Sequence, residues 1–239
     1  LLLSGYYLPG FKGGGPIRTI ANMMGHMREG HEFRIFTSDR DLGDSRPYDS
    51  ICPRAWNEFG GDWVYYAPPG LYFFWPLLRE CGRQENSVLY LNSFFSFRFS
   101  ILPLLLWRLL NSGTPVIVGP RGEFSGGALG LKATKKKAYI DLTQRLGLYR
   151  HVIWHASTQH EADDIRRVMG AGARIRVAID IASPPASLTL APRQNGAPLR
   201  IVFLSRISPK KNLLGAIEML RQVHSPGGFD VYGPAEDAA

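Results

Sequence analysis

Short apolar runs alternate along this chain with longer segments of helical periodicity, and this alternation limits the fold more than any other feature of the sequence. Strands that alternate with helices are typical of βαβ units, which build a parallel sheet covered by helices. The pattern therefore predicts an α/β protein. In the first part of the chain, strands are expected at residues 1–3, 33–37, 63–66, 88–91, 116–118, 152–154 and 175–179.

Local signals predict the helices between these strands. Apolar residues at helical spacing follow Pro16, which suits a first helical turn. Thr158 and Glu161 form a capping-box pattern, which indicates a second helix start. A third helix is expected over residues 133–146, whereas residues 41–62 have the composition of a long irregular loop.

A proline-rich stretch divides the chain. Residues 182–198 are typical of an interdomain linker and follow a first domain at residues 1–181. The pattern then restarts at residues 199–239 with a strand at 199–204, an amphipathic helix and a strand at 229–232. A segment this short does not bury an adequate core. We therefore expect the incomplete start of a second α/β domain, and a chain that is a fragment cut at both ends.

The longest apolar stretch, residues 88–110, has about the length of a membrane-spanning helix. It contains Pro103 and two charges, Arg98 and Arg108, which are costly inside a bilayer. The stretch therefore predicts a buried strand followed by a buried helix.

The overall charge indicates what kind of partner the chain prefers. The formal net charge is +8, and most of the cations are arginines. Such a surface favours anionic partners, namely phosphorylated metabolites, nucleic acid or anionic lipid headgroups. The two cysteines, Cys52 and Cys81, are too few for a disulfide framework or a zinc knuckle, which favours a reducing compartment.

A glycine-rich loop precedes the first helix. Gly13, Gly14 and Gly15 let the backbone come close to a ligand, and the helix start behind them, with Arg18 in its first turn, suits an anion. The loop is not a P-loop, because Pro16 stands where that motif has lysine. The alternative is a flexible connection without a ligand.

Two further loops follow predicted strands at the edge where open α/β sheets bind ligands. Arg206 follows the strand at 199–204, and Lys211 lies just before the next helix. Together they suit a diphosphate, and the alternative is a solvated basic loop. Arg121 and Glu123 follow the strand at 116–118 and are candidates either to contact a reacting sugar or phosphate or to pair with each other.

Other features are expected to be structural. The tripeptide 39–41 imitates an Asp-x-Asp metal motif, but this pattern is common by chance and predicts a solvated loop. His151 and His155 have no evident third ligand, so they predict no metal site. The aromatic residues of 65–75 and 94–99 are expected mainly in the core, and those of 94–99 have an acceptor groove or contact with lipid as alternatives.

The order of these motifs resembles the family 4 (group 1) glycosyltransferases, over nearly the whole length of the chain. The resemblance rests on residues 13–20, 27–33, 156–161, 205–206, 211–212 and 232–234.

The resemblance implies two Rossmann-like domains that face each other across a cleft, the GT-B arrangement, with the second domain truncated here. It implies a retaining transferase, of hexosyltransferase type, that moves a sugar from a nucleotide diphosphate sugar to a glycan or lipid-linked acceptor. Such an enzyme would serve polysaccharide biosynthesis without a metal or other cofactor. We expect it in the cytoplasm or at the inner membrane face, attracted there by anionic lipid, and we expect no nucleic acid partner.

The resemblance also implies roles for single residues. Arg206 and Lys211 match the pair that holds the donor diphosphate, and the 13–15 loop with Arg18 matches the loop near the phosphates and acceptor. The paired-glutamate motif of the family would follow Ala239, so activity is expected to need that further part.

Many members of the family have a histidine after the fifth strand, and this chain departs from that pattern, since Arg121 and Glu123 stand there instead. These two residues remain the candidate catalytic residues. Two other functions fit the same sequence. One is a non-hydrolysing nucleotide-sugar epimerase, and the other is a basic, non-catalytic anion-binding module.

Overall fold

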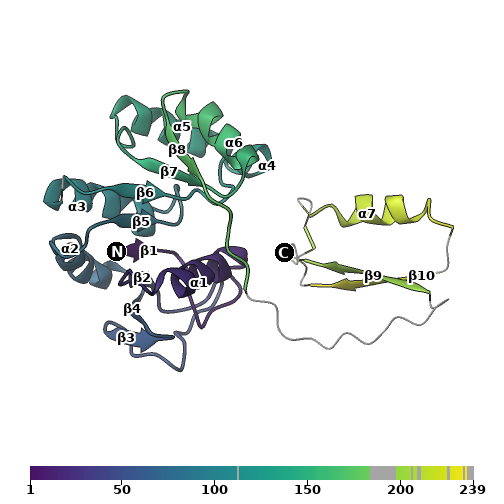
Figure 1. Cartoon of the computed structure of the whole chain (residues 1–239), viewed down its shortest axis with the longest axis horizontal. Coiled ribbons are helices and arrows are strands. Elements are labelled where there is room, and N and C mark those ends of the chain that lie inside the picture. The colour runs from purple at the N-terminus through teal and green to yellow at the C-terminus, as the bar shows by residue number, and fades with distance from the viewer. Residues whose placement is uncertain are drawn as a thin grey trace. The chain divides into compact units, whose positions relative to one another are not determined.

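The computed structural model describes residues 1–111, 113–183, 198–205, 207–208, 211–224, 227–233 and 235. The chain divides into two compact units, Leu1–Pro184 and Pro185–Ala239, which are described separately (Figure 1). Most of the stretch expected to be a linker, residues 182–198, lies outside the described residues.

The first unit is built on an eight-stranded mixed sheet with the order β3-β4-β2-β1-β5-β6-β7-β8. Its neighbouring strands are parallel, except that β3 runs antiparallel to β4. From β1 the order proceeds one way through β2 and β4 and the other way through β5 to β8, so it reverses between β1 and β5. This is a Rossmann-like arrangement. The strands are β1 Leu2–Leu3, β2 Arg34–Ser38, β3 Trp56–Phe59, β4 Asp62–Ala67, β5 Leu89–Leu91, β6 Val116–Val118, β7 Ile153–Ala156 and β8 Arg174–Val177.

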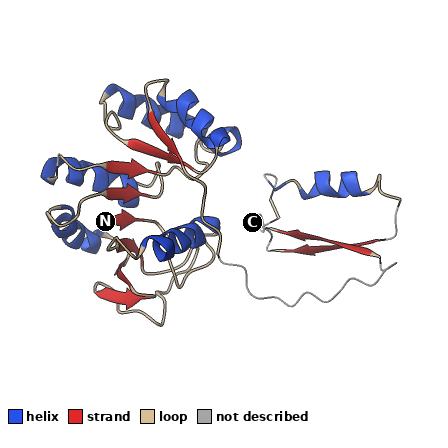
Figure 2. Ribbon diagram, in the orientation of Figure 1, coloured by secondary structure: helices blue, strands red, loops and turns tan. Residues whose placement is uncertain are grey.

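Helices connect these strands (Figure 2). They are α1 Gly15–Met27, η1 Leu71–Phe73, α2 Phe74–Cys81, η2 Phe97–Ile101, α3 Leu102–Leu110, α4 Gly126–Gly130, α5 Ala133–Arg145 and α6 Gln159–Met169. The capping-box prediction is confirmed at α6, where the Thr158 hydroxyl accepts a hydrogen bond from the Glu161 amide at 3.1 Å.

Two apolar clusters fill the space between the sheet and the helices. Successive strand residues point to opposite faces of a sheet, and accordingly Leu2 belongs to one cluster and Leu3 to the other. Ile20 of α1 packs in the Leu2 cluster, whereas Leu77 of α2 and Trp107 of α3 pack in the Leu3 cluster. Helices therefore cover both faces of the sheet.

The structure corrects the sequence analysis at residues 41–62 and 65–75. Strand β3 lies inside the expected loop, and α2 was not anticipated. The expectation that the 65–75 aromatics lie in the core holds for Tyr65 but fails for Trp75, which is 72% exposed. Residues 88–110 do form a strand followed by helix, as predicted, and within the described ranges no helix combines the length and apolarity that a membrane crossing requires.

The second unit contains one βαβ arrangement, with β9 Leu199–Leu204, α7 Leu213–Leu220 and β10 Gly227–Tyr232. The two strands pair in parallel, with Leu199 opposite Gly227. Every described residue of this unit is at least partly exposed, and Leu204 is 79% exposed. The described part therefore has no buried core of its own.

This difference in burial predicts how the two units behave when they are separated. Residues 1–184 should unfold cooperatively in urea, because they contain both apolar clusters. Residues 185–239 should give narrow amide dispersion in a proton–nitrogen correlation spectrum, because few apolar side chains leave water. A dispersed spectrum of the short segment would contradict this expectation.

Candidate functional site

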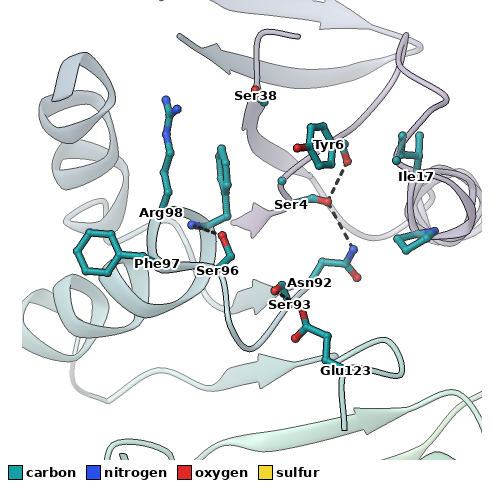
Figure 3. A pocket seen from close by; sticks show the side chains of 14 residues that line it. Ser4, Tyr6, Ile17, Ser38, Asn92, Ser93, Ser96, Phe97, Arg98 and Glu123 are labelled. Atoms are coloured by element: carbon teal, nitrogen blue, oxygen red, sulfur yellow. Dashed lines mark hydrogen bonds between the residues drawn. The ribbon is translucent and has the colours of Figure 1, made fainter. Parts of the chain in front are cut away.

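A cavity of about 580 Å³ lies at the carboxyl edge of the sheet in the first unit (Figure 3). Ser4 follows β1, Ser38 ends β2, Asn92 and Ser93 follow β5, and Glu123 lies in the loop after β6. The cavity thus spans the point between β1 and β5 at which the strand order reverses. Open α/β sheets bind their ligands at this position, which makes the cavity the candidate site.

Hydrogen bonds fix the polar side chains at the base of the cavity. The Ser4 hydroxyl donates to the Tyr6 carbonyl at 2.9 Å, and the Asn92 amide nitrogen lies 3.4 Å from the Ser4 oxygen (Figure 3). The Asn92 carbonyl oxygen accepts from Nε of Arg121 at 2.8 Å. Ser4 and Asn92 are both buried, so these groups are held in place before any ligand enters.

Two of the three glycines at the start of α1 are required by the structure. Gly14 has φ 78°, a left-handed conformation that favours glycine. A Cβ at Gly13 would lie only 2.9 Å from the Cβ of Tyr6, whereas Gly15 has open space around it. Gly13 lines the cavity.

The amides at the start of this loop already have an anionic partner. One carboxylate oxygen of Asp41 accepts from the Phe11 amide at 2.7 Å and from the Lys12 amide at 2.9 Å. Burial alone would raise the pKa of Asp41, but these amide hydrogen bonds, led by that of Lys12, hold it below its usual value. The Phe11 and Lys12 amides therefore serve the protein's own carboxylate. Arg18 is exposed and does not line the cavity.

Arg121 is a buried connector rather than a free cation. Its side chain is 8% exposed, and its two terminal nitrogens donate to the Tyr90 hydroxyl at 2.8 Å and to Asp180 at 2.6 Å. Tyr90 in turn contacts Nδ1 of His155 at 2.7 Å, which gives His155 a structural partner. Of the two alternatives for Arg121, an ion pair with Glu123 does not occur.

Glu123 lines the cavity and is held by the segment after β5. Its carboxylate accepts from the Ser93 hydroxyl at 2.7 Å, from the Phe94 amide at 2.5 Å and from the Phe95 amide at 3.3 Å. Burial raises the pKa of Glu123 above its ordinary value, although these hydrogen bonds oppose the shift. The Glu123 carboxyl group therefore holds the turn at residues 93–95. It faces the cavity as a weaker acid than an ordinary glutamate side chain.

No sequence motif predicted Arg98 as a site residue. Arg98 extends from η2 along the cavity wall, next to Phe97 (Figure 3), and its guanidinium lies 5.2 Å from the ring centroid of Phe99. Phe99 is buried, as expected for the 94–99 aromatics, whereas Phe97 is 64% exposed and lines the cavity. The only available signal was a charge inside the otherwise apolar stretch at 88–110.

The 39–41 tripeptide is not the solvated loop that its composition suggested. Asp39 is buried and binds the Arg40 guanidinium at 2.8 Å, while Asp41 holds the glycine-rich loop. Among the residues that the structure describes, no group of three or more His, Cys, Asp or Glu side chains is arranged to hold a metal ion.

The candidate diphosphate residues belong to the second unit. Arg206 lies outside the described residues. Lys211 is exposed and precedes α7, and its backbone amide donates to the Ser208 carbonyl at 3.0 Å. Asn212 caps the helix through its side chain, which accepts from the Gly215 amide at 3.2 Å.

The cavity offers hydroxyl and amide groups, one guanidinium and one carboxyl group, a set suited to a small polar ligand with several hydroxyls. A scan against protein-family models finds no match for this chain, and a search of curated proteins finds no relative.

Replacing Arg121 tests whether it connects the segments around the cavity. Arg121→Met should lower the free energy of unfolding by about 1–3 kcal/mol, because it leaves buried acceptors on Asn92 and Tyr90 without their donor. Urea denaturation measures the loss. The matched control, Arg18→Met on the exposed side of α1, should change stability by less than about 0.5 kcal/mol. Equal effects of the two substitutions would contradict the assignment.

The glycine loop allows a second matched comparison. Gly14→Ala should destabilise the protein by about 1–2 kcal/mol, because alanine is strained at positive φ. Gly15→Ala meets no neighbouring atom and should leave stability unchanged or raise it by a few tenths of a kcal/mol. Thermal melts of both variants check the order, and a Gly15 variant that melts below the Gly14 variant would show that the loop conformation is wrong.

Proposed function

We propose that the chain is part of a retaining glycosyltransferase of GT-B type, in which the first unit binds the acceptor and the second binds a nucleotide diphosphate sugar. The observation that carries this proposal is the hydroxyl-lined cavity at the reversal of strand order between β1 and β5. Its volume of about 580 Å³ suits a sugar-sized ligand. The sequence resemblance supplies the reaction class.

The cavity supports acceptor binding because its polar groups are fixed and paired. Ser4 and Asn92 are held by their hydrogen bonds, so their remaining donor and acceptor positions meet a ligand at defined places. Preorganised groups of this kind orient a reacting hydroxyl without a cost of rearrangement during the reaction. A glycan or the sugar of a lipid-linked acceptor would present such hydroxyls.

In the proposed reaction, the bond between the anomeric carbon and the diphosphate oxygen breaks, and the acceptor oxygen forms the new bond on the same face of the sugar. The diphosphate leaves with the bonding electrons and takes up the proton of the acceptor hydroxyl. Fixed cations stabilise the charge that develops on the leaving group. We assign this role to Arg206 and Lys211.

Arg121 and Glu123 then act as positioning residues rather than as groups that touch the reacting atoms. Arg121 orients Asn92, and Glu123 fixes the turn that presents Ser93 to the cavity. The positive net charge of the chain would also favour an anionic membrane surface, if the acceptor is lipid-linked.

The donor assignment predicts which substitutions weaken nucleotide binding. In the full-length protein, Arg206→Ala and Lys211→Ala should each weaken binding of UDP, GDP or ADP, whichever the parent binds, by about tenfold or more, because each removes a charge-assisted hydrogen bond. Isothermal titration calorimetry measures the affinities. Arg221→Ala, an exposed arginine at the end of α7, is the control and should bind as the parent does.

The outcomes separate the competing functions. Unchanged nucleotide affinity in both variants would contradict the donor assignment. A nucleotide-sugar product formed without acceptor would indicate an epimerase instead. Tight, salt-sensitive binding of DNA and heparin alike, without preference for a nucleotide, would indicate a non-catalytic anion-binding module.

A further inference from the structure

Arg98 is held in an unusual position on the cavity wall. Its guanidinium lies over the ring of Phe73, 4.3 Å from the centroid, and 5.2 Å from that of Phe99. One terminal nitrogen, Nη2, donates to the carbonyl of Pro68. Aromatic faces attract a cation and also restrict its movement. The guanidinium is therefore fixed in place by two rings and one backbone oxygen.

No carboxylate neutralises this guanidinium within the described part of the chain. The nearby carboxylate of Asp39 is bound through both oxygens by Arg40, at 2.8 and 3.2 Å. Nε of Arg98 is buried and has no hydrogen-bond acceptor among the described residues. Burial accordingly lowers the pKa of Arg98, with Asp39 opposing the shift and Arg40 adding to it. An arginine with unsatisfied donors at a cavity wall is suited to an anion from outside the protein.

The remaining groups around the cavity differ from Arg98 in character. Glu123 carries the carboxyl group of the lining, and its oxygens are already occupied by Ser93 and two amides. Figure 3 shows Arg98 and Glu123 at opposite sides of the cavity, with Ser96 on the side of Arg98. The hydroxyl groups of the lining therefore lie between the Arg98 guanidinium on one side of the cavity and the Glu123 carboxyl group on the other.

We propose that this cavity binds an acceptor that carries an oxyanion, either a carboxylate or a phosphate, in addition to its hydroxyl groups, and that Arg98 binds the oxyanion. That the bound molecule is an acceptor rests on the proposed function, whereas the anion preference of the cavity does not. A guanidinium binds carboxylate and phosphate oxygens with charge-assisted hydrogen bonds. The serine hydroxyls and Asn92 would contact the neutral part of the same molecule.

The experiment compares three probes of similar size on the 239-residue chain, namely glucose, glucuronate and glucose 6-phosphate. Calorimetry at low and moderate salt gives the affinities. We expect at least one of the two anions to bind about tenfold or more tightly than glucose, with an affinity that falls as salt is added. The anion that binds more tightly identifies the source as carboxylate or phosphate.

Substitution then assigns the preference to Arg98. Arg98→Met keeps an apolar side chain against Phe73 and Phe99. This variant should bind all three probes as weakly as the parent protein binds glucose. Arg98→Lys keeps the charge without the planar fork, should retain part of the preference, and decides the question if the methionine variant does not fold. Arg79→Met, an exposed arginine of α2 outside this cavity, is the matched control and should preserve the preference.

Equal binding of the three probes by the parent, or a preference that survives in Arg98→Met, would overturn the inference. Neither result would contradict the transferase proposal, because the three probes do not include a nucleotide sugar. Conversely, loss of the nucleotide assignment at Arg206 and Lys211 would leave a measured anion preference at Arg98 intact.

Discussion

The guanidinium of Arg121 joins segments that are far apart in the sequence and meet at the carboxyl edge of the sheet. It binds Asn92 and Tyr90 of the β5 region and Asp180, which follows β8. The segment around Asp180 is also tied to α1, because the Ile181 carbonyl accepts from the Asn22 side chain at 2.9 Å. The geometry of the cavity therefore depends on one buried cation whose donors are shared among these segments.

Much of the fold follows from local pattern. The predicted bounds of β6 and β9 match the structure, and the other predicted strands differ at their ends by no more than two residues. β3 escaped prediction because this four-residue edge strand lacks a continuous apolar run, and α2 escaped because it is short and contains Pro76. The role of Arg98 depends on Phe73 and Pro68, which lie far from it in the sequence, and no local pattern contains those contacts.

The glycine-rich loop shows why a motif alone does not define a ligand site. Its sequence suits an anion, and the amides of Phe11 and Lys12 do bind one, but that anion is the carboxylate of Asp41. The same interaction fixes the loop at the edge of the cavity, where a Cβ at Gly13 would lie only 2.9 Å from the Cβ of Tyr6. Gly13 and Gly14 are thus explained by packing and backbone conformation before any ligand is considered.

This distribution of charge decides where selectivity can arise in the first unit. Asp41 occupies loop amides, Arg40 neutralises Asp39, and Arg121 is engaged by Asp180, so these charges are balanced within the protein. Arg98 has no such partner among the described residues. Because Arg98 is partly buried, its interaction with an incoming oxyanion is stronger than the same interaction would be in water. A ligand that enters the cavity is therefore discriminated by its charge at Arg98, whereas the fixed serine and asparagine groups discriminate by the placement of its hydroxyls.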